Sequence, residues 1–180
     1  QYNAEVVSAI AELCSETGCE TEIHLHHDDD TAENLHAIIA RGKAELASHR
    51  LLSSDRAGNI VFGFVHGNWA LANCDPRGIN CGVTEEIEVL QKSGCYADFT
   101  MPSAPHPTQP KTINSIYYST NKGCRPLENG HASAVHAPKR TGLLMVQGPL
   151  GLNWQRRKWG LIPRIENGSL TGANPPTLQR

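Results

Sequence analysis

Apolar residues recur at alternating helical and strand periods along the first hundred residues. Residues 4–17 carry apolar side chains three and four positions apart, which predicts a helix with Gly18 as the residue that ends it. A β-like segment over 21–28 follows. A second apolar stripe of helical period then runs to about His49, and Asp30 stands where an N-cap is expected.

The same alternation continues through the middle of the chain. Residues 60–66 are dense in β-branched and aromatic side chains and predict a strand. A loop rich in Asn, Asp, Pro, Gly and Cys spans 72–83. Thr84 is then expected to cap a helix that ends at Gly94, and residues 96–101 predict the next strand.

The second half of the chain is less regular. Four prolines break the stretch 102–110 into a loop. Further strands are predicted over 112–120 and 143–147, separated by a surface stretch over 121–141. The residues after Asn167 are polar and predict a loosely ordered tail.

Helices and strands in alternation are typical of α/β folds, in which helical crossovers join parallel strands. We therefore predict a parallel α/β fold, as an open sheet or as a partial or distorted (β/α) barrel. Residues 1–166 are expected to form a single domain, itself a piece of a longer one, and 167–180 its tail. Functional side chains in such folds follow the carboxyl ends of strands, as Asp28, His66 and the loop 102–109 do here.

The charge balance narrows the range of partners. The chain has 16 Lys+Arg against 18 Asp+Glu and a formal net charge of −2, with no basic block, so we expect no nucleic-acid partner. No apolar run approaches the roughly 18 residues of a membrane span, so we expect no membrane partner. The chain opens without a signal-peptide pattern, which favours a cytoplasmic location. The oligomeric state is left open.

The six cysteines include no Cys-x-x-Cys pair, which argues against a zinc ribbon. Cys74 and Cys81 flank a loop and could be bridged only in an oxidising compartment. We expect free thiols.

The most concentrated chemistry lies in the run 24–30, which holds three imidazoles and three carboxylates. Side chains alternate between the faces of a strand, so His24, His26 and Asp28 share one face while His27 lies on the other. Neutral imidazole with carboxylate suits zinc, iron, nickel or manganese better than calcium or magnesium. We predict a divalent metal, with zinc favoured, on these residues. The alternative is a solvated acidic helix start whose histidines pack or lie exposed.

A second candidate site follows the strand 60–66, in the sequence His66-Gly67-Asn68-Trp69. Gly67 and Asn68 permit close backbone approach, and Trp69 offers a flat apolar face of the kind that stacks on a sugar ring. A core tryptophan behind a turn explains these residues equally well. His106, in the proline-rich loop, is a further candidate for lining the same cleft.

Two segments carry a family resemblance. Residues 64–71, Phe-Val-His-Gly-Asn-Trp-Ala-Leu, and residues 88–102, which include Gly94-Cys95-Tyr96-Ala97-Asp98, resemble the middle of polysaccharide deacetylases of the NodB-homology kind. There a strand ending in a Gly-x-Trp turn leads to a helix and then to the next strand. Residues 24–28 fall where that family keeps its metal-binding second motif. The resemblance covers about residues 5–120, and 143–152 resembles a later core strand.

The resemblance implies a metal-dependent hydrolase that removes N- or O-acetyl groups from a glycan. It implies that His24, His26, His27 and Asp28 hold the ion, which activates water. The family's early aspartate pair, which supplies a base and a metal ligand, has no counterpart in this sequence, and its late Leu-x-His motif, which supplies the acid, is also absent. Asp29 or Asp30 is the nearest replacement for the base, although capping of the following helix explains both better, and His66 is a second catalytic candidate. We expect slow catalysis at most.

Two other interpretations stay open. The spacing His24-x-His26-x-Asp28 also fits the start of the metallo-β-lactamase-like signature, although Asp29 stands where that signature has a histidine. A non-catalytic fragment that binds metal or carbohydrate is the third interpretation.

Overall fold

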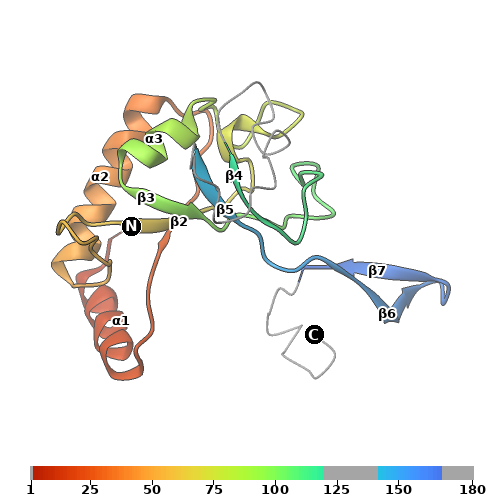
Figure 1. The fold of residues 1–180 in the computed structure, drawn as a ribbon, viewed down its shortest axis with the longest axis horizontal. Coiled ribbons are helices and arrows are strands. Elements are labelled where there is room, and N and C mark those ends of the chain that lie inside the picture. Colours follow the sequence, from red (N-terminus) through yellow and green to blue (C-terminus); the bar gives the residue numbers. More distant parts are fainter. Residues whose placement is uncertain (1, 120–141, 168–180) are drawn as a thin grey trace.

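The computed structural model describes residues 2–119 and 142–167 (Figure 1). The helices are α1 (Ala4–Thr17), α2 (Ala32–Ser48) and α3 (Glu86–Lys92), with a 3-10 turn, η1 (Leu71–Asn73). The strands are β1 (Ile23–Leu25), β2 (Phe62–His66), β3 (Cys95–Asp98), β4 (Ile116–Ser119), β5 (Leu143–Val146), β6 (Gly151–Lys158) and β7 (Ile162–Glu166). The predicted stretch 121–141 and the predicted tail lie almost wholly outside the described residues.

The main sheet has five strands in the order β1-β2-β3-β5-β4. The strands β1, β2, β3 and β5 pair in parallel, and β4 pairs antiparallel with β5. The prediction of a parallel α/β fold is therefore confirmed for the first three strands, which are also adjacent. No closed barrel is found in the part of the chain that the structure describes.

The register places Ile23, Phe64 and Asp98 side by side across the sheet, and Met145 beside Asp98. All four side chains are buried. They share this core with the inner faces of α2 and α3, which lie on one side of the sheet (Figure 1). His24 belongs to the alternate set of positions and is exposed. The sheet thus has one face covered by these helices and another on which His24 is open to solvent.

Helix α1 forms as predicted but does not join the core. The side chain of Asn3 accepts hydrogen bonds from the first turn, and Gly18, at a φ of 69°, donates its amide to Cys14. No residue of α1 is buried, and its apolar side chains at Val6 and Leu13 are more than half exposed. The helical period therefore predicted the element correctly but did not reveal which surface it packs against.

Two helix starts differ from the prediction. The N-cap of α2 is Thr31, whose hydroxyl accepts from the Asn34 amide at 3.2 Å, and not Asp30. The Asp30 carboxylate instead accepts from the Thr31 amide and the Asn34 side chain. Helix α3 begins at Glu86, two residues beyond the predicted cap Thr84. Short polar side chains cluster before both helices, so the pattern could not single out one cap.

The polar segment after residue 150 contains a hairpin that the sequence pattern did not predict. Strands β6 and β7 pair antiparallel, and Figure 1 shows them standing apart from the main sheet. Trp154 and Trp159 are exposed on this hairpin. Strands without a buried face lack the alternation on which the prediction depends.

None of the described helices is long and apolar enough to span a lipid bilayer.

The burial contrast between α1 and α2 gives a stability prediction. Leu35 on α2 is fully buried, so Leu35→Ala should lower the free energy of unfolding by about 2–5 kcal/mol. The matched change Leu13→Ala on α1, where the side chain is 58% exposed, should alter it by no more than about 0.5 kcal/mol. Urea titrations followed by circular dichroism measure both. Equal losses would show that α1 packs against the core.

Candidate functional site

The carboxyl ends of β1 and β2 carry two groups of polar side chains on opposite faces of the sheet. His24 and His26 lie on the exposed face and are called here the exposed histidine pair. His27 points the other way and meets His66, Cys81 and Glu86, which together are called the buried cluster. Consecutive residues reach opposite faces because the backbone is extended.

In the buried cluster, Nε2 of His27 lies 2.9 Å from one carboxylate oxygen of Glu86. Cys81 Sγ donates to the other oxygen at 3.3 Å, and Nε2 of His66 lies 3.9 Å from it. One ligand atom from each residue falls within 4.8 Å of all the others. The buried cluster could therefore hold a metal ion, and it is the only such group of three or more ligands among the described residues.

Glu86 organises this cluster. Its side chain is completely buried in the first turn of α3, and the Ala72 amide of η1 donates to it at 2.6 Å. With His27 and Cys81, the carboxylate has partners from three other segments. A carboxylate in a dry site needs such partners, because burying it unpaired costs several kcal/mol.

Burial sets the protonation of the cluster. Burial alone would lower the pKa of His27, but its hydrogen bond to Glu86 and the nearby carboxylates raise it above its ordinary value. Burial lowers the pKa of His66 to about 4, so this imidazole is neutral near pH 7. Burial, with Glu86 nearby, raises the pKa of the Cys81 thiol. Without an ion, Cys81 is a protonated thiol.

One ring nitrogen of His66 is hydrogen-bonded, and the other is not. The Asn68 amide donates to Nδ1 at 3.2 Å, while the buried Nε2, which faces Glu86, has no hydrogen-bond partner. An ion on Nε2 would move the imidazole proton to Nδ1 and break the Asn68 bond. Such a bond contributes about 1 kcal/mol, whereas structural zinc binds with about 10–16 kcal/mol, so the residues fit an ion.

The exposed histidine pair is ordered by Asn68. The Nε2 atoms of His24 and His26 lie 3.1 Å apart, and Nδ1 of His26 lies 2.9 Å from the Asn68 side-chain oxygen. The Asn68 amide group donates to the His27 carbonyl at 2.9 Å, which fixes which end is oxygen. His26 therefore carries its proton on Nδ1, and its Nε2 lone pair faces His24.

Gly67 leaves the space that the His26 ring occupies. A Cβ atom at Gly67 would stand 2.4 Å from atoms of the His26 ring, far inside van der Waals contact. A side chain at this position would force the His26 ring to move away from the turn after β2.

The structure does not gather the four predicted metal ligands into one group. His24 and His26 form the exposed pair, while His27 belongs to the buried cluster. The carboxylate of Asp28 accepts from the amides of Asp29 and Asn80 and so ties the loop 72–83 to the end of β1. Asp29, the predicted base, is exposed and has a φ of 47°.

The predicted substrate-binding residues Trp69 and His106 lie next to each other. Their ring centroids are 5.3 Å apart, and Trp69 is 42% exposed. Trp69 also lines an open cavity of about 420 Å³ with residues that follow β3 and β5, including Thr100, Pro102 and Gly148. His106 is held by a hydrogen bond between its Nδ1 and the hydroxyl oxygen of Thr108, 2.8 Å long.

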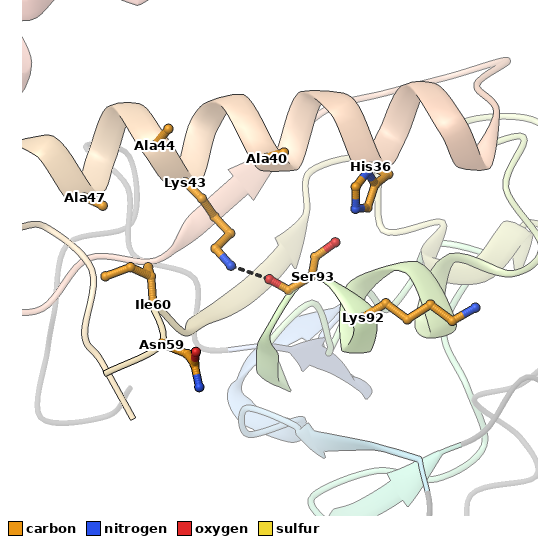
Figure 2. A pocket seen from close by; sticks show the side chains of 9 residues that line it. All are labelled: His36, Ala40, Lys43, Ala44, Ala47, Asn59, Ile60, Lys92 and Ser93. Atoms are coloured by element: carbon orange, nitrogen blue, oxygen red, sulfur yellow. Dashed lines mark hydrogen bonds between the residues drawn. The ribbon is translucent and has the colours of Figure 1, made fainter. Parts of the chain in front are cut away.

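A second cavity, of about 470 Å³, lies between α2 and α3 (Figure 2). Lys43 reaches across it from α2 and donates to the Ser93 carbonyl at 2.5 Å. Ile60 and Ser93, which line it, precede β2 and β3. This cavity is thus near the amino ends of the strands, away from the candidate site.

Sequence reasoning missed Cys81 and Glu86. Cys74 and Cys81 are both buried free thiols, as predicted, but the sequence pattern did not indicate Cys81 as a ligand. Glu86 lies within the helix that the sequence predicts after Thr84, and the pattern did not indicate it as a ligand. Its signal was present, because Glu86 stands four residues before the buried Leu90, where an apolar side chain is expected.

No family model, curated protein or solved structure matches this chain.

Asp98 gives a pH-dependent prediction. Its carboxyl group accepts from the amide and hydroxyl of Thr100, whose hydroxyl oxygen in turn accepts from the His66 amide. Burial raises the pKa of Asp98 to about 7. The folded state therefore holds its proton more tightly than the unfolded chain. This contribution to stability is complete below about pH 4 and is lost as the pH rises through 7.

Between pH 4 and pH 7 the free energy of unfolding should fall by about 1.4 kcal/mol for each unit that separates the folded-state pKa of Asp98 from its unfolded-state pKa. Asp98→Asn should flatten this part of the stability profile, while the exposed Asp29→Asn should leave it unchanged. Urea midpoints measured from pH 4 to 8 provide the check. An unchanged slope in Asp98→Asn would refute the assignment.

Proposed function

We propose that this chain is a metal-dependent hydrolase of the carbohydrate deacetylase kind, acting on N- or O-acetyl groups of a glycan. The observation that carries the proposal is the exposed histidine pair, with the proton of His26 fixed on Nδ1 by Asn68. Two Nε2 atoms that face each other at the carboxyl edge of a parallel sheet are suited to hold a catalytic ion in place of the hydrogen bond between them. The sequence resemblance to NodB-homology deacetylases supports the reaction class.

The ion that suits this pair best is zinc. In metal-binding histidines the ring nitrogen that does not bind the metal usually donates a hydrogen bond to a fixed acceptor, as Nδ1 of His26 does to the Asn68 side-chain oxygen. Two imidazoles leave coordination positions open to water and substrate, which a catalytic centre requires. When bound, the ion would polarise the acetyl carbonyl and lower the pKa of a water molecule.

The chain's own residues would divide the remaining work. Asp29 is exposed, three residues after His26 in the sequence, and is our candidate for the base that takes a proton from water. His66 is completely buried in the other group, so it would position Asn68 through its backbone turn and would not touch substrate. Trp69 and His106 would hold the sugar ring beside the open cavity.

The arrangement of layers also supports this proposal. In a (β/α) barrel the helices cover the outside, and side chains on the inner face at the carboxyl edge form the site. Here α2 and α3 cover one face, and His24 lies on the other. We propose that the sheet is part of a distorted barrel whose inner face carries the exposed histidine pair.

A non-catalytic protein that binds metal or glycan is the second candidate. It is favoured by the finding that, among the described residues, no third His, Cys or carboxylate gathers with the exposed pair. Missing a general acid or base typically costs about 10²–10⁴-fold in rate. The metallo-β-lactamase-like alternative has less support, because Asp28 is occupied by two loop amides.

The hydrolase proposal predicts slow, zinc-dependent release of acetate from chitin oligosaccharides or acetylxylan. His26→Ala should reduce that release at least tenfold, because it removes one ligand and the contact with Asn68. His36→Ala, an exposed histidine on α2, is the matched control and should keep full activity. Gly67→Ala should behave like His26→Ala, because its methyl group displaces the ring.

Acetate is measured enzymatically, with folding of each variant verified by circular dichroism. Zinc binding without any acetate release from several acetylated glycans would favour the non-catalytic candidate. Full activity of His26→Ala would show that the exposed pair is not the catalytic centre.

The stacking role of Trp69 can be tested separately. Trp69→Ala should weaken glycan affinity by about tenfold, or about 1.4 kcal/mol, because it removes the apolar face on which the sugar ring would pack. Trp159→Ala, on the outlying hairpin and 77% exposed, should leave affinity unchanged. Isothermal titration with chitin oligosaccharides measures both. Equal affinities for the two variants would exclude Trp69 from the binding site.

A further inference from the structure

The buried cluster has the composition of a closed transition-metal site. Two imidazoles, a thiol and a carboxylate are all zinc ligands, and four protein ligands leave no position for substrate. We propose that His27, His66, Cys81 and Glu86 bind a structural divalent ion, zinc by preference, at a site separate from the exposed histidine pair. This inference does not depend on the proposed function.

The distances suit a single ion. Ligand atoms around a tetrahedral zinc lie roughly 3.3–3.8 Å apart, given bond lengths of about 2.0–2.3 Å. In the cluster, Glu86 oxygens lie 2.9 Å from His27, 3.3 Å from Cys81 and 3.9 Å from His66. The largest separation within the set is under 4.8 Å. Side-chain shifts of an ångström or less would close the coordination sphere.

One unpartnered nitrogen, Nε2 of His66, points independently to a missing ligand. His66 is completely buried, and its Nε2 faces the cluster with no hydrogen-bond partner. His27 turns its Nε2 to the cluster. Its Nδ1 lies 3.3 Å from Oδ2 of Asp30, and neither Nδ1 nor this carboxylate oxygen completes a hydrogen bond. A carboxylate behind a histidine is the usual support for a metal-binding imidazole.

The charges favour a divalent ion. Binding would release the Cys81 proton to solvent and displace the proton between Nε2 of His27 and Glu86, leaving two neutral imidazoles, one thiolate and one carboxylate in the site. Together with a charge of +2 these make the cluster neutral, which suits a site where all four residues are buried. A monovalent ion would leave an uncompensated buried charge.

The ligands come from the ends of β1 and β2, from the loop 72–83 and from α3. An ion would therefore fasten α3 and the loop to the sheet edge. His26 is one residue from the ligand His27, and Asn68 is two residues from the ligand His66, so the ion would also hold the backbone next to the exposed pair, although the Asn68 bond to the His66 ring would be lost.

Cobalt substitution tests this site without using activity. The 180-residue chain is stripped with a chelator, reloaded with Co²⁺ and compared with the double variant His24→Ala, His26→Ala. Both proteins should show a thiolate-to-cobalt charge-transfer band and the intense visible bands of tetrahedral cobalt. Cys81→Ala should lose the charge-transfer band, whereas Cys95→Ala, a matched buried cysteine, should keep it.

A folded protein that takes up no cobalt, or a charge-transfer band that survives Cys81→Ala, would overturn the proposal. If Cys81→Ala does not fold, zinc X-ray absorption on the double histidine variant decides the matter. One sulfur at about 2.3 Å with nitrogen or oxygen at about 2.0–2.1 Å is the expected result. Nitrogen and oxygen scattering alone would refute it. Because that variant lacks the exposed pair, the outcome is independent of the proposed hydrolase.

Discussion

The buried carboxylate of Glu86 is the constraint on which the carboxyl edge of the sheet depends. It accepts from the Ala72 amide, contacts His27 and accepts from the Cys81 thiol. One side chain of α3 therefore joins η1, the segment after β1 and the loop 72–83. Such a group is stable in a dry interior only when its partners stay in place. The loop 72–83 is therefore held against the sheet by chemistry and not only by packing.

The two polar groups share a boundary but differ in their access to solvent. The buried cluster is closed, whereas the exposed pair, Trp69 and the neighbouring cavity are open. Asn68 connects them, because its amide contacts the His66 ring while its side chain orients His26 and bonds the His27 carbonyl. A binding surface supported by a rigid, buried framework is preorganised, which both a catalytic and a binding role require.

Sequence periodicity predicted the helices, the parallel strands and the placement of polar residues after β1 and β2. It also placed His24 and His26 on one face of the strand and His27 on the other, because the alternation of side chains along a strand depends only on neighbouring residues. It could not predict that Cys81 and Glu86, distant along the chain, would meet His66, since that depends on how α3 packs. It missed the hairpin β6–β7, whose side chains are mostly exposed and carry no apolar alternation.

The opposite orientation of His26 and His27 constrains how the sequence of this chain can evolve. Substituting one histidine alters one group and leaves the other intact. Inserting or deleting a single residue in β1 would instead exchange the faces, turning the cluster's imidazole outward and a pair member inward. The length of this strand is thus under a stricter constraint than most of its individual side chains, and variation should accumulate here by replacement and not by insertion or deletion.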